Sequence, residues 1–180
     1  MTRQISTLIL LLCYGALYSQ EQEKTNGVFY KASVSATLIN NEDYTLFNDN
    51  DESFIDVNGI FFNNTLGYQF DNRTSVGLNI EYAHYINQNL NFLPLYLDFT
   101  YNIFDFDDVV FVRGGYGKLV SLGKAFEDGT TYKVGFGYRA FDDNFKNSWL
   151  IGFDFSRKRY GFRQTEKLSS FSVFLEFMLF

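Results

Sequence analysis

The sequence lacks the long apolar runs that mark a helical membrane protein. Its mean hydropathy is −0.14, and the apolar run from Ile5 to Leu12 is much shorter than the roughly 20 residues that a spanning helix needs. This average gives no support for helical membrane spans. It does not exclude a membrane barrel, because the strands of such a barrel alternate apolar and polar residues.

Cysteine and histidine occur once each, and the chain shows no zinc-ligand spacing, glycine-rich phosphate loop or nucleic-acid-binding patch. Cys13 lies in an N-terminal segment with the order basic, apolar, small, which is typical of a secretory signal peptide. We expect residues 1–19 to be this signal peptide, with cleavage after Ser19. Leucines rather than small residues precede Cys13, so a lipoprotein cleavage box is a poor match. The mature chain would then contain no cysteine, which excludes disulfides and thiolate chemistry.

Aromatic residues are abundant, with 22 Phe and 13 Tyr in 180 residues, and this composition favours strands over helices. At this length we expect one domain, residues 20–180. The last twelve residues show a clear period of two, which places one continuous apolar face on an extended strand. That face consists of Phe171, Val173, Leu175, Phe177 and Leu179.

Seven further segments show the same alternation, most of them close to the 9–11 residues that a tilted strand needs to cross a bilayer. The eight segments are 28–38, 60–70, 76–82, 93–103, 110–116, 132–140, 149–155 and 169–180. The connections alternate between short turns, at 71–74, 105–108 and 142–147, and mostly longer loops, at 39–59, 85–91, 120–131 and 156–168. The pattern predicts an all-β fold, an eight-stranded antiparallel up-and-down transmembrane β-barrel with its short turns and both termini on the periplasmic side.

Every second predicted strand ends on phenylalanine, at Phe70, Phe104, Phe141 and Phe180, and an aspartate follows the first three. A ring of aromatic side chains with carboxylates just beyond it suits a boundary between lipid and water.

The other parity of the strands is rich in glycine and small polar residues, as expected for the narrow interior of an eight-stranded barrel. It also carries four basic and four acidic residues: Lys31, Arg113, Lys133 and Arg139 against Glu81, Asp98, Asp154 and Glu176. Lone buried charges are costly, so this balance predicts pairing across a small, plugged polar lumen without a stable open pore. A gated or selective polar path is the alternative interpretation.

A soluble barrel of the lipocalin kind is the main structural alternative. It would place the apolar face inside and the glycine-rich face in water, whereas soluble exteriors are usually dense in lysine and glutamate.

Four features together resemble small outer-membrane β-barrel proteins of Bacteroidota, of the OmpA-transmembrane or OmpX type within the porin family. They are the segment ending in Ser19-Gln20, the run Leu93 to Leu97, the run Gly135 to Arg139, and the terminal Phe180. The resemblance implies export to the cell outer membrane and a monomeric barrel. The balanced lumen and the absence of a catalytic set favour a non-enzymatic structural or accessory role. We expect outer-membrane lipid, lipopolysaccharide or a larger outer-membrane assembly as partners, and no nucleic acid. Phe180 departs from the family pattern, because it is out of phase with the apolar face that ends at Leu179. Either Phe180 faces the other side of the wall or the strand has a bulge near its end.

Two loops carry opposite charge. The loop Asn40 to Asn58 is acidic, and its stretch Asp49 to Ser53 has the oxygen spacing of a calcium loop, but no glycine follows Ser53 and Ile60 stands where a closing glutamate is needed. We therefore expect a solvated acidic loop and no metal site. The last loop is basic, with Arg157, Lys158, Arg159, Arg163 and Lys167. Its charges suit ion pairing with the acidic loop or contact with lipopolysaccharide phosphates or a partner, and both interpretations remain open.

Enzymatic alternatives centre on His84. Some outer-membrane barrels are lipid A deacylases or acyltransferases, and the deacylases carry a serine two residues after the histidine, where this chain has Ile86. We therefore predict no catalytic residue and no cofactor. A lipid A-modifying enzyme and a narrow small-solute channel stay as alternatives.

Overall fold

The computed structural model describes residues 26–40, 55–105, 109–123, 125–142 and 147–180. Nine strands and one short 3₁₀ helix are present in these ranges. They are β1 Gly27–Asn40, β2 Ile55–Gln69, β3 Thr74–Tyr85, β4 Leu90–Phe92, β5 Pro94–Asp105, β6 Val109–Leu119, β7 Gly129–Phe141, β8 Asn147–Tyr160, η1 Phe162–Gln164 and β9 Glu166–Leu179. The described residues contain no helix that is long and apolar enough to span a membrane.

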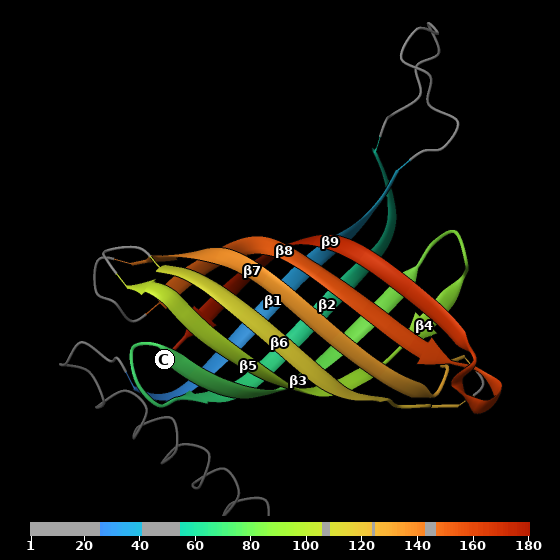
Figure 1. The fold of residues 1–180 in the computed structure, drawn as a ribbon, viewed down its shortest axis with the longest axis horizontal. Coiled ribbons are helices and arrows are strands. Elements are labelled where there is room, and N and C mark those ends of the chain that lie inside the picture. The colour runs from blue at the N-terminus through green and yellow to red at the C-terminus, as the bar shows by residue number, and fades with distance from the viewer. Residues whose placement is uncertain (1–25, 41–54, 106–108, 124, 143–146) are drawn as a thin grey trace, which may run out of the picture.

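The strands close into a barrel (Figure 1). All pairings are antiparallel: β1 with β2, β2 with β3, β3 with both β4 and β5, and then each strand with the next as far as β9. β1 also pairs with β9, which closes the sheet. β4 extends the ladder of β5 along β3, and only Leu93 separates β4 from β5. The wall therefore has eight positions, and the predicted fold class is confirmed.

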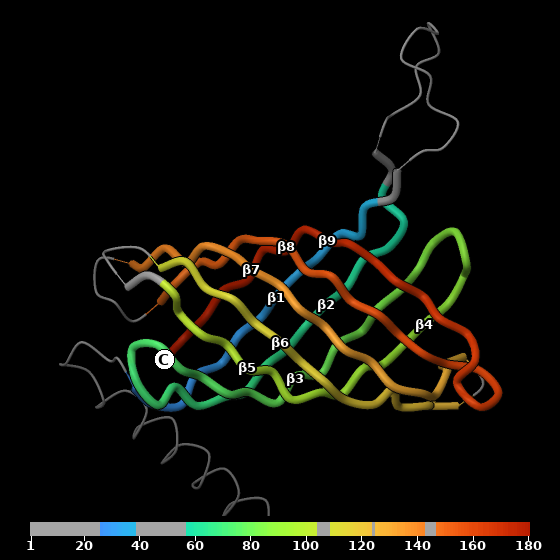
Figure 2. Tube along the Cα trace, viewed as in Figure 1, coloured from blue at the N-terminus to red at the C-terminus, as the bar shows by residue number. Residues whose placement is uncertain are grey.

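The register fixes the tilt of the strands. A path that follows paired residues around the wall from Val28 returns to β1 at Leu38, ten residues further on. The path runs through Tyr68, Val76, Phe99, Gly114, Val134, Phe155 and Phe171. For eight strands a stagger of ten residues corresponds to a tilt of roughly 40° from the barrel axis. Figure 2 shows the strands crossing the barrel obliquely.

The outward face is apolar and the inward face is charged and polar. Leu66, Leu97 and Tyr116 are 63%, 62% and 67% exposed, whereas Lys31, Glu81 and Asp154 are at most 3% exposed. This arrangement is the reverse of a soluble protein, in which lysine and glutamate lie outside. The soluble-barrel alternative needed the opposite orientation of both faces.

Three loop predictions need correction. β8 continues to Tyr160 and β9 begins at Glu166, so the predicted loop 156–168 shrinks to residues 161–165. β4 begins at Leu90, inside the predicted loop 85–91. β1 and β2 likewise extend into the predicted loop 39–59.

The turn between β2 and β3 shows how a short connection is stabilised. The Asp71 carboxylate accepts hydrogen bonds from the backbone N–H groups of Arg73, at 2.8 Å, and Thr74, at 2.6 Å. These bonds favour the ionised carboxylate and lower the pKa of Asp71. The other two predicted short turns fall partly outside the described residues.

Phe180 follows the inward parity of Phe174 and Met178, and the pairing of β9 shows no register shift, so the suggested bulge is wrong. The Phe180 ring lies 6.1 Å from the ring of Phe29 and packs against an apolar cluster inside the barrel.

Candidate functional site

The barrel interior brings together the charged residues that the alternation placed there. All eight predicted residues are buried in the lumen: Lys31, Glu81, Asp98, Arg113, Lys133, Arg139, Asp154 and Glu176. Their side chains come from β1, β3, β5, β6, β7, β8 and β9, because each strand directs alternate residues inward.

Ion pairs join seven of these residues into one alternating chain. Arg113 holds Asp154 with two hydrogen bonds, Nη2 to Oδ2 at 2.7 Å and Nε to Oδ1 at 2.9 Å, and its Nη1 lies 3.2 Å from Glu176 Oε2. Lys31 Nζ lies 3.2 Å from Glu176 and 3.4 Å from Asp98. Lys133 contacts Glu81 at 2.5 Å and Asp154 at 3.7 Å.

Lys158 completes this chain, contrary to its predicted position in an outer loop. Its side chain is fully buried, and its Nζ lies 3.2 Å from Glu81 Oε1. The chain of alternating charges therefore contains four acids and four bases, in the order Asp98, Lys31, Glu176, Arg113, Asp154, Lys133, Glu81 and Lys158. From this position Lys158 cannot contact a ligand outside the barrel.

Arg139 lies apart from these ion pairs. Its Nε donates to Ser148 Oγ at 2.9 Å and its Nη1 to Gln69 Oε1 at 3.3 Å. Its guanidinium also lies 4.4 Å from the ring centroid of Phe141 and 5.4 Å from that of Phe180. Arg139 thus joins the aromatic end of the lumen rather than the charge chain.

Two buried clusters rich in aromatic residues lie inside the barrel, one on each side of the charged middle, and neither was predicted from the sequence. Near the short-turn end the cluster consists of Phe29, Val109, Phe111, Leu150, Phe174 and Met178. Near the long-loop end it consists of Phe61, Ala83, Tyr85, Phe92 and Leu119. The signal was available, because these residues share the inward parity of their strands.

A chain of hydroxyl and amino groups runs through the cluster near the long-loop end. Ser170 Oγ lies 3.0 Å from Tyr85 Oη, which accepts a hydrogen bond from Lys158 Nζ at 3.2 Å. A serine, a tyrosine and a lysine in this order can activate a hydroxyl when the lysine is a base. Here Glu81 holds Lys158 as a cation, and the rings of Phe61 and Phe92 lie 4.5 and 5.9 Å from its Nζ. Ser170, Tyr85 and Lys158 thus form a buried hydrogen-bonded group in the interior.

His84 lies on the outer side of β3, partly buried. Its Nδ1 is 2.8 Å from Asn91 Oδ1, and the Tyr82 hydroxyl donates to the same oxygen at 3.1 Å. No serine or carboxylate partner of His84 occurs among the described residues. Within the same part of the chain, no group of three or more His, Cys, Asp or Glu side chains could hold a metal ion.

The remaining residues of the predicted basic loop lie outside the lumen. Arg159, Arg163 and Lys167 are exposed and Arg157 is partly buried. Most of the acidic loop, including the calcium-like stretch Asp49 to Ser53, lies outside the described residues, as does the predicted signal peptide.

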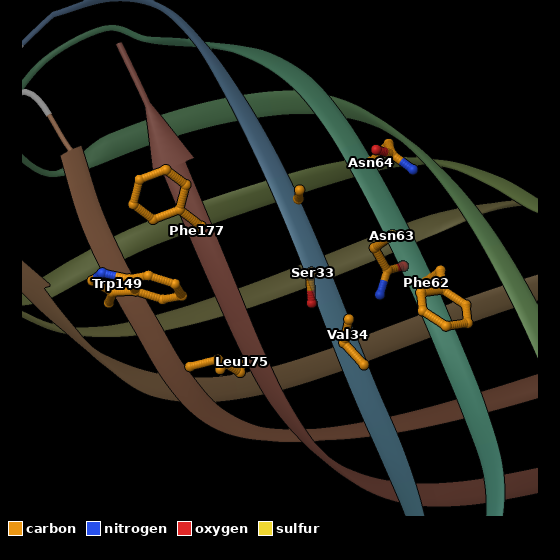
Figure 3. A pocket seen from close by; sticks show the side chains of 9 residues that line it. Ser33, Val34, Phe62, Asn63, Asn64, Trp149, Leu175 and Phe177 are labelled. Carbon is orange, nitrogen blue, oxygen red and sulfur yellow. The ribbon is translucent and has the colours of Figure 1, made fainter.

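A shallow groove of about 270 Å³ crosses the outer wall over β8, β9, β1 and β2 (Figure 3). Its lining combines the large side chains of Trp149, Phe177 and Phe62 with the small side chain of Ala32. The groove follows from this difference in side-chain size.

No family model and no curated protein matches the sequence. Among solved structures, the chain is similar to the crystal structure of the N-terminal β-barrel domain of Pseudomonas aeruginosa OprF. The TM-score is 0.48 and the sequence identity 10%, over 86% of this chain and 99% of that one. Neither the activity nor the partners of that protein follow for this chain at such identity.

Proposed function

We propose that this chain is an integral outer-membrane β-barrel protein without enzymatic activity, acting as a structural or accessory component through its outer surface and loops. The observation that carries the proposal is the reversed burial: the wall is apolar outside and the charges lie inside. In water such a surface would be a large aggregation hazard, whereas in a bilayer it is the lipid-facing band of a barrel.

The packed interior supports a structural role. A chain of buried ion pairs lies in the middle of the lumen, with a buried hydrophobic cluster toward each end. A barrel of eight strands has an interior just wide enough for side chains. We accordingly propose that no large pore opens through it, and that residues 1–19 direct export.

A pair of matched leucines tests the membrane location. Leu66 and Leu122 are 63% and 64% exposed. Leu66 lies on the outward face of β2, between Asn64 and Tyr68, whereas Leu122 lies in the β6–β7 connection. In lipid, Leu66→Arg should cost about 2–4 kcal/mol of folding free energy, because arginine near the midplane is poorly solvated. Leu122→Arg should cost less than about 0.5 kcal/mol.

The measurement is the free energy of unfolding of both variants and the wild type, refolded into phosphatidylcholine vesicles and titrated with guanidinium chloride. Equal stability of the two variants, together with a wild type that stays soluble and folded without detergent, would exclude the membrane location.

A narrow path for small solutes is the second candidate. Four inward hydroxyl groups on β1 and β9 have no hydrogen-bond partner among the described residues: those of Ser33, Ser35, Thr37 and Ser172. They line one side of the lumen beside the seam between β1 and β9. A small solute that crossed the barrel would need polar partners, and these unpartnered hydroxyls are such groups, provided that the side chains around them move apart.

A further inference from the structure

Three cations stand close together on the outside of the barrel wall, where β8 meets β9. Arg159 and Lys167 face each other directly across the ladder, and Arg157 faces Ser169, the next outward residue of β9. Residues on one face directly opposite each other have Cβ atoms about 4.5–5.5 Å apart, and diagonal neighbours are roughly 7–8 Å apart. Arg157, Arg159 and Lys167 therefore form one compact set, which we name the outer cationic patch.

Lys118 extends the patch across the neighbouring strands. Lys118 faces Thr130, and Thr130 faces Arg159. At a tilt of roughly 40°, each step to the next strand rises about 3 Å along the barrel axis and each residue along a strand about 2.5 Å. Arg159 lies two strands from Lys118 and therefore about 6 Å higher. Arg157 lies two residues below Arg159, about 5 Å lower, so Arg157 and Lys118 are at nearly the same height.

The four cations of the patch lack ion-pair partners among the described residues, although Asp128, two residues from Thr130, is also exposed. The nearest acid in sequence, Glu166, belongs to the opposite parity from Lys167, and its carboxylate lies against Gly161. Like charges directly opposite each other on a sheet destabilise it. The facing of Arg159 and Lys167 thus has a cost that a bound anion would remove.

A second observation points to a ligand. Arg157 Nε is buried and has no hydrogen-bond partner among the described residues. A buried guanidinium N–H without an acceptor is unusual. Because Nε is covered in this conformation, a phosphate would bond it only after the Arg157 side chain turns outward, where its planar fork suits phosphate oxygens.

The position of the patch selects the source of the phosphate. Tyr116 and Tyr132 face each other one outward row below Lys118 and Thr130, with Tyr116 67% exposed. Exposed tyrosines above an apolar band are typical of the headgroup level of a barrel. At comparable levels the other half of the wall presents Leu38, Ile60, His84 and Leu93 instead of lysine or arginine. The cations are therefore confined to β6, β8 and β9, as in a site rather than a general belt.

We propose that the outer cationic patch binds the phosphate groups of a phosphorylated glycolipid headgroup in the outer leaflet. The proposal rests on the proposed membrane location and adds a ligand class and a site to it. Arg157, Arg159 and Lys167 hold one phosphate, and Lys118 contacts a second charge of the same headgroup.

The test uses the mature chain in detergent with lipid A that carries both phosphates, and the same lipid after enzymatic removal of the phosphates. Native mass spectrometry measures how much lipid the folded barrel retains. We expect retention of the phosphorylated form, and a loss of about tenfold or more for Arg159→Gln with Lys167→Gln, which removes two charge-assisted contacts.

Two variants with the same change of charge elsewhere serve as controls. Arg163→Gln lies in η1 beyond the wall, and Arg73→Gln lies in the turn at the opposite rim. Both should retain lipid as the wild type does. Removing Arg159 and Lys167 should also leave the denaturation midpoint in zwitterionic detergent unchanged or higher, because their mutual repulsion disappears.

Three outcomes would overturn the proposal. The first is equal retention of both lipid forms, and the second is unchanged retention in the double variant. The third is a rise of the denaturation midpoint with inorganic phosphate alone that equals the rise with the lipid. Each of these can occur in a barrel that inserts and folds in vesicles, which leaves the membrane location standing. Failure of the wild type to insert at all would instead contradict the proposed function.

Discussion

Arg113 and Asp154 form a bidentate ion pair in the middle of the barrel, with guanidinium and carboxylate joined at 2.7 and 2.9 Å. Each partner also belongs to the larger chain of charges: Arg113 pairs with Glu176, and Asp154 lies 3.7 Å from Lys133. The guanidinium lies 3.7 Å from the ring centroid of Phe174, which belongs to the cluster near the short-turn end. The pair therefore connects the chain of charges to that cluster.

Breaking this pair on one side should be strongly destabilising. Arg113→Met or Asp154→Asn leaves a buried charge short of a partner, which typically costs about 3–5 kcal/mol of folding free energy. The double variant should lose less than the sum of the two, because it removes one charge of each sign and leaves the net charge of the lumen unchanged. The measurement is guanidinium unfolding in vesicles for the full double-mutant cycle. Arg73→Met, which removes an exposed guanidinium, is the control and should change stability by less than about 0.5 kcal/mol.

Two glycines on neighbouring strands test how closely the lumen is packed. A Cβ atom at Gly135 would meet Asp154 Oδ1 at 2.1 Å and the Phe153 backbone oxygen at 2.7 Å, whereas a Cβ at Gly114 would find its nearest neighbour at 3.9 Å. Gly135→Ala should therefore destabilise by about 1–3 kcal/mol, because it displaces the carboxylate that Arg113 binds. Gly114→Ala should be neutral or slightly stabilising, since glycine in a strand is entropically unfavourable. Equal stability of the two variants in the same unfolding assay would contradict the described packing.

Chemical labelling can locate Lys158. In the folded barrel an amine-reactive acylating reagent should modify the exposed Lys167 and leave Lys158 unmodified, because Lys158 is fully buried and bound to Glu81. After unfolding by heat in dodecyl sulfate, both lysines should react. Peptide mass spectrometry gives the extent of modification at each site. Rapid labelling of Lys158 in the folded protein would contradict its buried position and favour the predicted position in the outer loop.

The face on which a residue lies is local information, whereas its ion-pair partner is not. A strand directs alternate residues to opposite faces, so the inward position of Lys31, Arg113 or Glu176 follows from its immediate neighbours. The order of the ion pairs does not, because the contact of Lys133 on β7 with Glu81 on β3 depends on barrel closure and on the stagger of ten residues around the wall.

Lys158 shows why the outer ends of strands are hard to read. The predicted seventh strand ended at Phe155, where apolar alternation gives way to Arg157-Lys158-Arg159. Above the apolar band the outward residues are polar as well, so the contrast between the two faces disappears while the strand continues to Tyr160. The parity of Asp154 and Ser156 still extends to Lys158, and a count by twos would have placed it inside. Its partner Glu81 lies 77 residues away and could not be found in this way.

The last prediction concerns conduction through the barrel. Reconstituted into a planar bilayer, the wild type should show no stable conductance steps, because ion-paired side chains fill the lumen between the aromatic clusters at Phe111 and Phe174 and at Phe61 and Tyr85. An open porin in the same bilayer is the control for the recording.

The seam of unpartnered hydroxyls at Ser33, Ser35, Thr37 and Ser172 is the narrowest route that could remain. Discrete steps in the wild type that disappear when Ser35 is replaced by the bulkier Leu would favour the narrow-channel function over the packed structural barrel, since the substitution fills that seam without changing charge. Steps that persist in Ser35→Leu would place the path elsewhere and contradict the packed lumen altogether.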